Sequence, residues 1–564
     1  MNFMALQIAA GPFFIFIRVH FVNTDKYVSL CINKQSDCSM KNSIEKLMLI
    51  PALLLCSCTL EEVEDIAGQE SRNVSHDMII LGDKLEDPYS LSNVEAALTK
   101  VYPSKAGRVI VDATDLYVRF LPVSEREYNT LTDLGLNLTD HPLDYEILQD
   151  GDYYHDPSLP DNAITWQYAV VSPDFHFPTY IRYEILDECY IPDNGAATRA
   201  DDGIDWDEVE REAFRLTGHS DMLLPEVKGE SGALAPKGTI LIKDDRLNEG
   251  EACGLAGVKV MCNTFVKFAS AYTDAGGEYE MDMTFSTDIR YRIVFQNVKG
   301  FAIGLNKILV PASTSTLGKG SPEGVSITID KDSDRKLFAR SAANNAAYEY
   351  FERCEEEGQE IPTPPANTRL WLFQPMESSA CLMLQQGVLI DDTFIGKFLG
   401  DYGELVKMFL PDVVIGIKEL YEYSSIYAQV VHELAHASHY SQAGNEYWNK
   451  YADYIAKSFI KSGGRMYGTG AEDNSGYCEV GEMWAYYVQN RLYKERYGED
   501  KSTFGTSYWF KPHILLYLDE RGLGRSAICK ALKPEVNSRQ TLHSSLENLY
   551  PDYGTIINQA FERY

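Results

Sequence analysis

The chain has 564 residues, which is enough for about three domains. Its hydrophobic content is 45% and its formal net charge is −32, as expected for a folded protein with a strongly acidic surface. Such a surface has no excess of basic groups to neutralise phosphates, so nucleic acid is excluded as a partner.

The segment 40–57 predicts export. Lys41 and Lys46 precede a short apolar run over 47–55, and a small residue stands just before Cys58. This layout is that of a signal peptide. Its last residues resemble a bacterial lipobox, which implies that Cys58 is lipidated and that the protein is an outer-membrane lipoprotein on the periplasmic side or the cell surface.

This interpretation divides the start of the chain. Residues 1–39 become an extension ahead of the true start at Met40, and residues 58–85 become a tether. An uncleaved membrane anchor is the alternative, although the apolar run is too short to span about 30 Å of hydrocarbon comfortably.

Residues 86–230 predict a mixed α/β region. Helices are expected over 92–100 and 206–216, and a strand over 108–112. No group of side chains here suggests catalysis.

Short alternating strands separated by glycine-rich turns follow over residues 235–310. The expected strands lie at 237–244, 256–262, 272–281 and 291–295. This spacing predicts a small antiparallel sandwich. The pattern of turn residues resembles the carboxypeptidase regulatory-like (transthyretin-like) β-sandwich, which implies an all-β spacer or docking domain without its own chemistry.

The cysteines do not predict a disulfide framework. Seven scattered cysteines follow Cys58, and an odd number does not make a scaffold. Cys253 and Cys262 either pair across a hairpin or remain two half-buried thiols. No C-x-x-C motif follows Cys58, so a thiolate zinc site has no support.

Residues 335–564 predict the last domain, after a linker over 313–322. A helix is expected over 340–357 and a β region from 370. The apolar run 412–417 predicts a strand just before the next helix, and an edge strand there could offer its backbone to an extended substrate.

The strongest motif is H-E-x-x-H, formed by His432, Glu433 and His436. Residues four apart on a helix lie on one face, so both imidazoles can reach one zinc ion. Glu433 then lies beside the metal, where it can take a proton from water that the metal has acidified.

The motif helix is expected to begin after Ser424 or Ser425 and to stop at Gly444. One side carries apolar residues that face the core, namely Ile426, Val430, Leu434 and Ala437. The proposed ligands lie on the opposite, polar side, which is expected to face a cleft.

A third ligand must come from elsewhere. Metzincins would carry glycine and histidine where this chain has His439 and Gln442, so that class is excluded, and His439 is read as a residue of the cleft or behind the ligands. A downstream helix offers Glu482 and Glu479, and Glu446 is a third candidate.

Glu482 is preferred among these three candidates. Ala485 follows Glu482 by three residues, and its small side chain allows the second helix to pack closely on the first. Glu479 and Glu446 remain open as alternatives.

The region 412–489 resembles the gluzincin metallopeptidases, specifically lipid-anchored ones of Gram-negative bacteria. The resemblance implies a zincin-like (thermolysin-like) α+β catalytic domain with one Zn2+ held by His432, His436 and Glu482. It also implies that Glu433 is the general base and then carries the proton to the leaving amine.

A hydrogen-bond donor to the transition state is also implied by this resemblance. Tyr486, Tyr487 and His513 are the candidates, and the sequence does not choose between them.

The expected architecture is therefore a multidomain α+β protein that hydrolyses peptide bonds of a peptide or protein substrate at the membrane. The alternative is a catalytically silent zincin-fold lipoprotein that binds a protein or glycan partner. The presence of Glu433 disfavours this alternative, because a binding scaffold needs no general base. Hydrolysis of a non-peptide amide would leave the same sequence pattern.

Overall fold

The computed structural model describes residues 5–10, 13–18 and most of 78–564, with gaps at 161–162, 193–202, 226–232, 248–249, 305–311, 333, 357–360, 375, 401–409, 463–465 and 502–507. Two compact units are distinguished, residues 1–71 and 72–564. In the first, β1 (Ala5–Ala10) and β2 (Phe13–Arg18) form an antiparallel pair. The predicted signal peptide and Cys58 lie outside the described residues.

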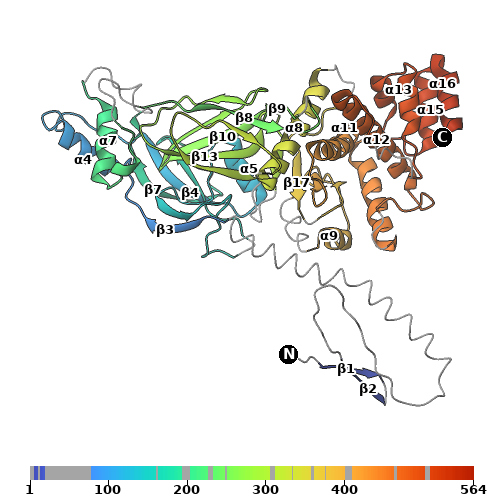
Figure 1. The fold of residues 1–564 in the computed structure, drawn as a ribbon, viewed down its shortest axis with the longest axis horizontal. Helices are drawn as coiled ribbons and strands as arrows, with labels where there is room; N and C mark the ends of the chain where they lie inside the picture. Colours follow the sequence, from blue (N-terminus) through green and yellow to red (C-terminus); the bar gives the residue numbers. More distant parts are fainter. Residues whose placement is uncertain are drawn as a thin grey trace. The chain divides into compact units, whose positions relative to one another are not determined.

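The described part of the second unit is mixed α+β (Figure 1). It begins with β3 (Ile80–Lys84), which pairs with β5 (Tyr145–Gln149). The end of the predicted tether is therefore an ordered strand. A three-stranded antiparallel sheet follows, in the order β6 (Gln167–Val171), β4 (Asp115–Leu121), β7 (Arg182–Cys189).

Three helices accompany these strands: α4 (Leu91–Val101), α5 (Glu125–Asp133) and α7 (Trp206–Leu216). Both predicted helices are thus confirmed. The strand predicted over 108–112 is wrong, because this run pairs with no strand in the described chain. Val111 is buried among residues of α4 and α7 while Ile110 is exposed, so packing against helices produces the alternation.

Two sheets make up the next region. The smaller has the order β12 (Glu278–Glu280), β8 (Lys237–Lys243), β16 (Ile327–Ile329), and β9 (Ala252–Gly254) pairs with β8. The larger contains β11 (Lys267–Tyr272), β10 (Val258–Thr264) and β13 (Ile289–Asn297), and β15 (Thr314–Gly320) pairs with β13. Side chains from both sheets share one buried core.

The larger sheet continues beyond the predicted domain boundary. It runs from β13 through β14 (Ala302–Gly304), β17 (Arg369–Phe373) and β19 (Val413–Gly416) to β18 (Ala380–Cys381). The linker predicted over 313–322 is wrong, because β15 occupies it and pairs with β13 along six residues. The strand region and the helical region therefore share one sheet.

The remaining residues are mostly helical. The helices are α8 (Arg335–Glu356), α9 (Asp392–Leu399), α11 (Tyr423–Ser462), α12 (Ser475–Tyr497), α13 (His513–Glu520), α14 (Arg525–Ala531), α15 (Arg539–Leu549) and α16 (Gly554–Arg563). Two short 3-10 turns add Ser220–Met222 and Pro551–Tyr553. Among the described helices, none is long and apolar enough to cross a membrane.

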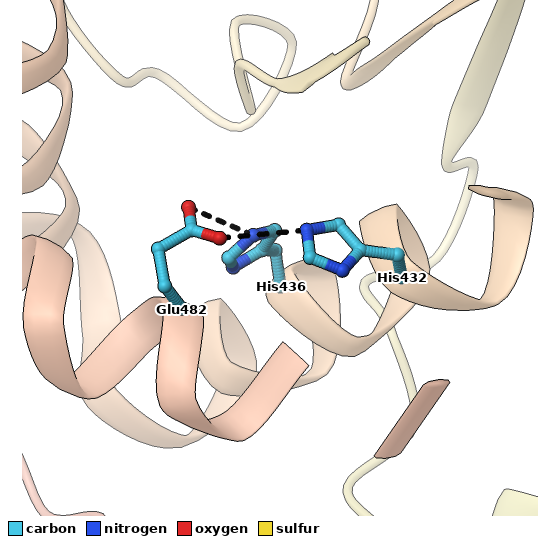
Figure 2. Close-up of side chains that lie close together, drawn as sticks. All are labelled: His432, His436 and Glu482. Carbon is cyan, nitrogen blue, oxygen red and sulfur yellow. Dashed lines mark ion pairs between the residues drawn. The ribbon is translucent and has the colours of Figure 1, made fainter. Parts of the chain in front are cut away.

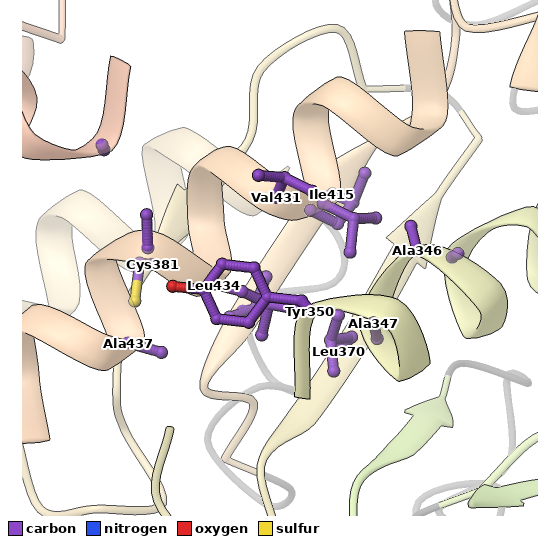
Figure 3. Packing of buried hydrophobic residues seen from close by; sticks show 14 of the residues in the cluster. Ala346, Ala347, Tyr350, Leu370, Cys381, Ile415, Val431, Leu434 and Ala437 are labelled. Carbon is purple, nitrogen blue, oxygen red and sulfur yellow. The ribbon is translucent and has the colours of Figure 1, made fainter. Parts of the chain in front are cut away.

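The core around α11 explains why this helix forms where it does. Figure 3 shows Val431, Leu434 and Ala437 of α11 packed near residues of α8 and of the shared sheet. The Tyr350 hydroxyl of α8 lies 2.7 Å from Ser438 Oγ, which adds a polar contact to this apolar interface. The predicted apolar stripe is confirmed, because all four of its residues are fully buried.

The predicted limits of the motif helix fare differently. The helix begins at Tyr423, so Ser424 and Ser425 lie inside it. Gly444 has φ of 80°, a left-handed conformation that glycine adopts easily, and it breaks the helical path as predicted. A second helical stretch follows in α11 and returns residues such as Tyr451 to the site.

None of the seven described cysteines forms a disulfide. Cys262 is buried and Cys253 is partly buried, so the interpretation as two thiols holds and the disulfide alternative is wrong.

Candidate metal centre

Helix α11 presents His432, Glu433 and His436 to one small cavity, and Figure 2 shows the two histidines beside Glu482. None of the three is more than 4% exposed. The face that was predicted to be directed towards a cleft thus lines a cavity, and it is largely buried, although Gln429 and Tyr440 on it are partly exposed.

Glu482 of α12 completes the group. Its Oε2 lies 3.5 Å from His432 Nε2, and its Oε1 lies 3.4 Å from His436 Nε2. All three ligand atoms lie within 4.8 Å of one another, and Glu482 is 1% exposed. The structure therefore brings together the three residues that the sequence predicted as ligands.

These separations fit a metal better than direct hydrogen bonds. They exceed the usual 2.7–3.2 Å for an N–H···O bond, and Glu482 Oε2 has no hydrogen-bond partner among the described residues. Two ligands about 2.0–2.1 Å from one tetrahedral zinc lie about 3.3–3.4 Å apart. A buried His-His-Glu group at this spacing can hold a metal ion.

The charges of the group support the same conclusion. Burial alone would raise the pKa of Glu482, but His436 and His432 lower it well below its usual range. Burial lowers the pKa of His432, while Glu482 and Glu433 raise it more, so the net shift is upward. The lowered pKa favours the ionised carboxylate, which is the form that binds a metal.

Close packing of α12 on α11 fixes Glu482. The indole of Trp484 donates a 3.0 Å hydrogen bond to the Ala435 carbonyl, and Gln489 donates to the Ala428 carbonyl. A Cβ at Gly481 would lie 3.2 Å from the Tyr451 ring, so a larger residue would push the ring away.

Tyr451 orients the carboxylate directly. Its hydroxyl donates a 2.6 Å hydrogen bond to Glu482 Oε1. Sequence reasoning missed this residue, because nothing in its own neighbourhood shows that α11 turns back at Gly444 and places it beside Glu482.

The two alternative ligands lie elsewhere. Glu479 Oε2 accepts a 3.0 Å hydrogen bond from the backbone N–H of Arg539, where α15 begins. It therefore ties α12 to α15. Glu446 is exposed and does not belong to the metal-ligating group found in the described chain.

Glu433 is held beside the ligands. Its Oε1 accepts a 2.9 Å hydrogen bond from Gln429 Nε2, one turn earlier on α11. Burial raises the pKa of Glu433, and the neighbouring histidines oppose this increase. A carboxylate with a raised pKa is a stronger base, as a general base at neutral pH requires.

The aromatic rings around the histidines hold their orientation. His432 packs edge-to-face on Tyr486 with ring centroids 4.5 Å apart, and His436 packs on Trp448 and Tyr451. The Nδ1 atoms of both histidines have no hydrogen-bond partner within the described chain. Packing therefore does here what a hydrogen bond at Nδ1 does in many metal sites.

His439 does not face the cavity. Its ring packs against Tyr447 and Trp448, and burial lowers its pKa to about 3. The interpretation as a residue behind the ligands is the one the structure supports, and the interpretation as a cleft residue is wrong.

The candidate donors are separated by the fold. Tyr486 contacts His432, whereas Tyr487 faces Asp519 and His513 stacks on Tyr564, both away from the cavity. Tyr467, which the sequence did not suggest, lines the cavity and interacts with Tyr486.

Strand β18 forms another wall of the cavity through Ala380 and Cys381. In the described part of the sheet, β18 is the terminal strand and β19 lies between β17 and β18. The expectation that the 412–417 run is the edge strand is wrong, because β18 covers its outer side. The remaining lining residues include Ile390, Phe394, Ile455 and Met466.

Comparison with known proteins adds no identification: no family model and no curated protein matches the chain. The interpretation of the site therefore depends on its own geometry.

Proposed function

We propose that this protein is a zinc-dependent peptidase whose ion is held by His432, His436 and Glu482. The observation that carries the proposal is the spacing of 3.4–3.5 Å between the carboxylate oxygens and the two imidazole nitrogens, in a group where Glu433 is also buried. Such a spacing suits one small cation, and the glutamate that follows His432 has the position of a general base.

Zinc bound there would act as a Lewis acid and lower the pKa of a bound water to about 7. Glu433 would take the proton from the attacking water and deliver it to the leaving amine. Gln429 limits the rotation of Glu433, and Tyr451 fixes the carboxylate of Glu482. Tyr486, whose ring contacts His432, and Tyr467, which lines the cavity, are the proposed hydroxyl donors to the transition state.

Strand β18 supports a peptide as the substrate. As the edge strand beside α11, it has backbone groups that can pair with an extended peptide. The apolar side chains of Ile390, Phe394 and Ile455 favour an apolar residue near the scissile bond. The finer assignments to a thermolysin-like zincin fold and a transthyretin-like sandwich are part of the same proposal.

The location is proposed from the sequence alone. The lipobox-like segment before Cys58 supports a lipid anchor in the outer membrane. The catalytic region would then act on peptides at the membrane surface.

A second candidate is a catalytically silent lipoprotein that binds a protein or glycan partner. The cavity beside the metal group measures only about 30 Å³, and four of the residues that line it, His432, Glu433, His436 and Glu482, are at most 4% exposed. That space holds an ion with a water molecule but no peptide, as a purely structural metal site would.

The deciding experiment compares the wild-type protein with Glu433→Gln after expression of the full chain. Both proteins are analysed for zinc by mass spectrometry and for cleavage of casein and a peptide library. We expect about one zinc per chain in both and a loss of cleavage of more than about 100-fold in the variant.

The outcomes separate the two candidates. Zinc in both proteins with cleavage by neither favours the silent binding protein. Full cleavage by Glu433→Gln would show that another group is the base, and cleavage that persists after complete chelation would remove the metal from the reaction.

A further inference from the structure

A second cavity lies on the other side of the shared sheet region, away from the metal group. Its volume is about 220 Å³, and neither metal ligands nor Glu433 line it. One wall is the outer face of the larger sheet. The other is formed by α5 and residues 138–141 of the N-terminal region.

The register of the strands explains the polar wall. Lys259 and Met261 of β10 pair with Val294 and Arg292 of β13, so all four side chains lie on the same face. Alternate residues such as Val260 and Ile293 point into the buried core. The inner face of these strands is therefore apolar, whereas their outer face carries the cations Lys259 and Arg292.

Arg292 is the unusual residue of this cavity. It is 3% exposed, yet its Nε and Nη1 atoms have no hydrogen-bond partner in the described chain. It also has no ion pair with a carboxylate among the described residues. A buried charge without a partner is costly, so its presence in a cavity points to an anion that binds there.

A chain of hydrogen bonds fixes the guanidinium. Its Nη2 lies 3.1 Å from His141 Nε2, and His141 Nδ1 lies 2.9 Å from Asp140 Oδ1. Arginine can only donate, so His141 accepts at Nε2 and donates its Nδ1 proton to Asp140. Asp140 is thereby engaged with His141 and with the N–H of Tyr154, and does not contact Arg292.

The remaining carboxylates of the lining are Asp152 and the exposed Asp133, and neither forms an ion pair with Arg292 or Lys259 among the described residues. Asp152 is paired with Arg340, and Arg369 is paired with Glu125. Within the described chain, the Lys259 ammonium donates to the amide oxygen of Asn137 and has no carboxylate partner.

We propose that this cavity binds a small molecule bearing a carboxylate or phosphate group, with its oxygens bound by Arg292 and attracted by Lys259. Guanidinium groups bind both anions by charge-assisted hydrogen bonds. The cavity is smaller than the roughly 300–1,000 Å³ of common ligand sites, so the ligand has only a few carbon atoms. This inference does not depend on the metal or on peptidase activity.

Isothermal titration calorimetry of the full-length protein tests the proposal. The probes are inorganic phosphate, succinate and the uncharged polyol xylitol, at constant ionic strength. We expect saturable binding of phosphate or succinate and no binding of xylitol. The anion that binds more tightly shows whether the ligand carries a phosphate or a carboxylate group. Absence of binding by both anions, or equal binding of xylitol, would overturn the proposal.

Arg292→Gln and Arg290→Gln form a matched pair of variants. Arg290 lies two residues away on the same strand, is paired with Asp150 and does not line the cavity. We expect anion binding to weaken by at least about tenfold in Arg292→Gln and by less than about threefold in Arg290→Gln. Equal effects in the two variants would show a non-specific response to charge and contradict the site.

Lys259→Gln provides a second variant if Arg292→Gln does not fold. Lys259 is only partly buried, so its replacement is expected to leave the fold intact. Binding of the preferred anion should weaken by at least about threefold. Unchanged binding in this variant would show that the cavity does not use its positive charge.

Discussion

The metal centre and the Arg292 cavity are two buried polar regions with opposite chemistry. At the metal centre, two imidazoles and a carboxylate direct acceptor atoms toward one point, and Glu482 Oε2 has no donor among the described residues. In the Arg292 cavity, the atoms without partners are donors. Unmatched acceptors suit a cation, and unmatched donors suit an anion.

The two regions also differ in how the chain builds them. Three of the four residues at the metal centre come from two consecutive turns of α11, and the fourth comes from the next helix. Arg292 and Lys259 come from two paired strands, and His141 comes from a loop more than 100 residues earlier in the chain. The metal centre can therefore be predicted from local sequence periodicity, whereas the Arg292 cavity cannot.

The largest expected effect concerns the metal. Glu482→Gln should bind zinc more than about 100-fold more weakly, because it loses a charged ligand. Glu479→Gln, three residues earlier on the same helix, should keep full zinc affinity and lose about 1 kcal/mol of stability at the start of α15. Competition with a chromophoric chelator measures both zinc affinities. If only the Glu479 variant bound zinc more weakly, Glu479 rather than Glu482 would be the third ligand.

A pair of buried arginines tests whether the Arg292 charge really lacks a partner. Arg340 is 4% exposed and is bound by Asp152, Ser315 Oγ and the Thr314 carbonyl. Arg340→Met should therefore lower the free energy of unfolding by about 3 kcal/mol, because it leaves the Asp152 carboxylate without its arginine partner.

Arg292→Met should instead change stability by less than about 1 kcal/mol, or increase it, in buffer without phosphate or carboxylates. Urea denaturation of both variants gives the comparison. A cost for Arg292→Met as large as that for Arg340→Met would mean that the fold already compensates this charge.

A further prediction applies the same principle to one carboxyl group. Asp412 is fully buried, and burial raises its pKa to about 7, despite hydrogen bonds from the Arg369 N–H and Gln386. The folded protein then holds a proton that the unfolded chain releases near pH 4, so this group's contribution to stability falls as pH rises from about 4 to about 7.

Asp412→Asn removes that dependence. The free energy of unfolding of the variant, relative to that of wild type, should increase by on the order of 2 kcal/mol when the pH is raised from about 5 to about 8. Denaturant unfolding at both pH values measures the difference. A constant difference between the two proteins would show that Asp412 titrates in its ordinary range.

Some of this structure could be predicted from local sequence. The helix expected over 206–216 and the break at Gly444 were found where periodicity and glycine placed them. The preference for Glu482 was also supported, because a small residue one turn later marks a closely packed helix.

Long-range pairing could not be predicted in the same way. The Ser-, Thr- and Gly-rich run 313–322 has the composition of a linker, and it is a strand only because β13 offers it six partners. Tyr451 and Arg292 gain their roles from a helix break and a sheet register, which single residues do not reveal. The choice between β18 and β19 as the edge likewise depends on strand order.

The continuous sheet limits how this protein can be divided. β17 lies between β14 and β19, so its backbone is paired on both sides. A fragment that began at residue 335 would keep the metal ligands but leave β17 without β14. An exposed strand edge of this kind promotes aggregation. The metal-binding part is therefore not an independent domain. Replacing or deleting the preceding strands would make it less soluble even where the metal ligands are unchanged.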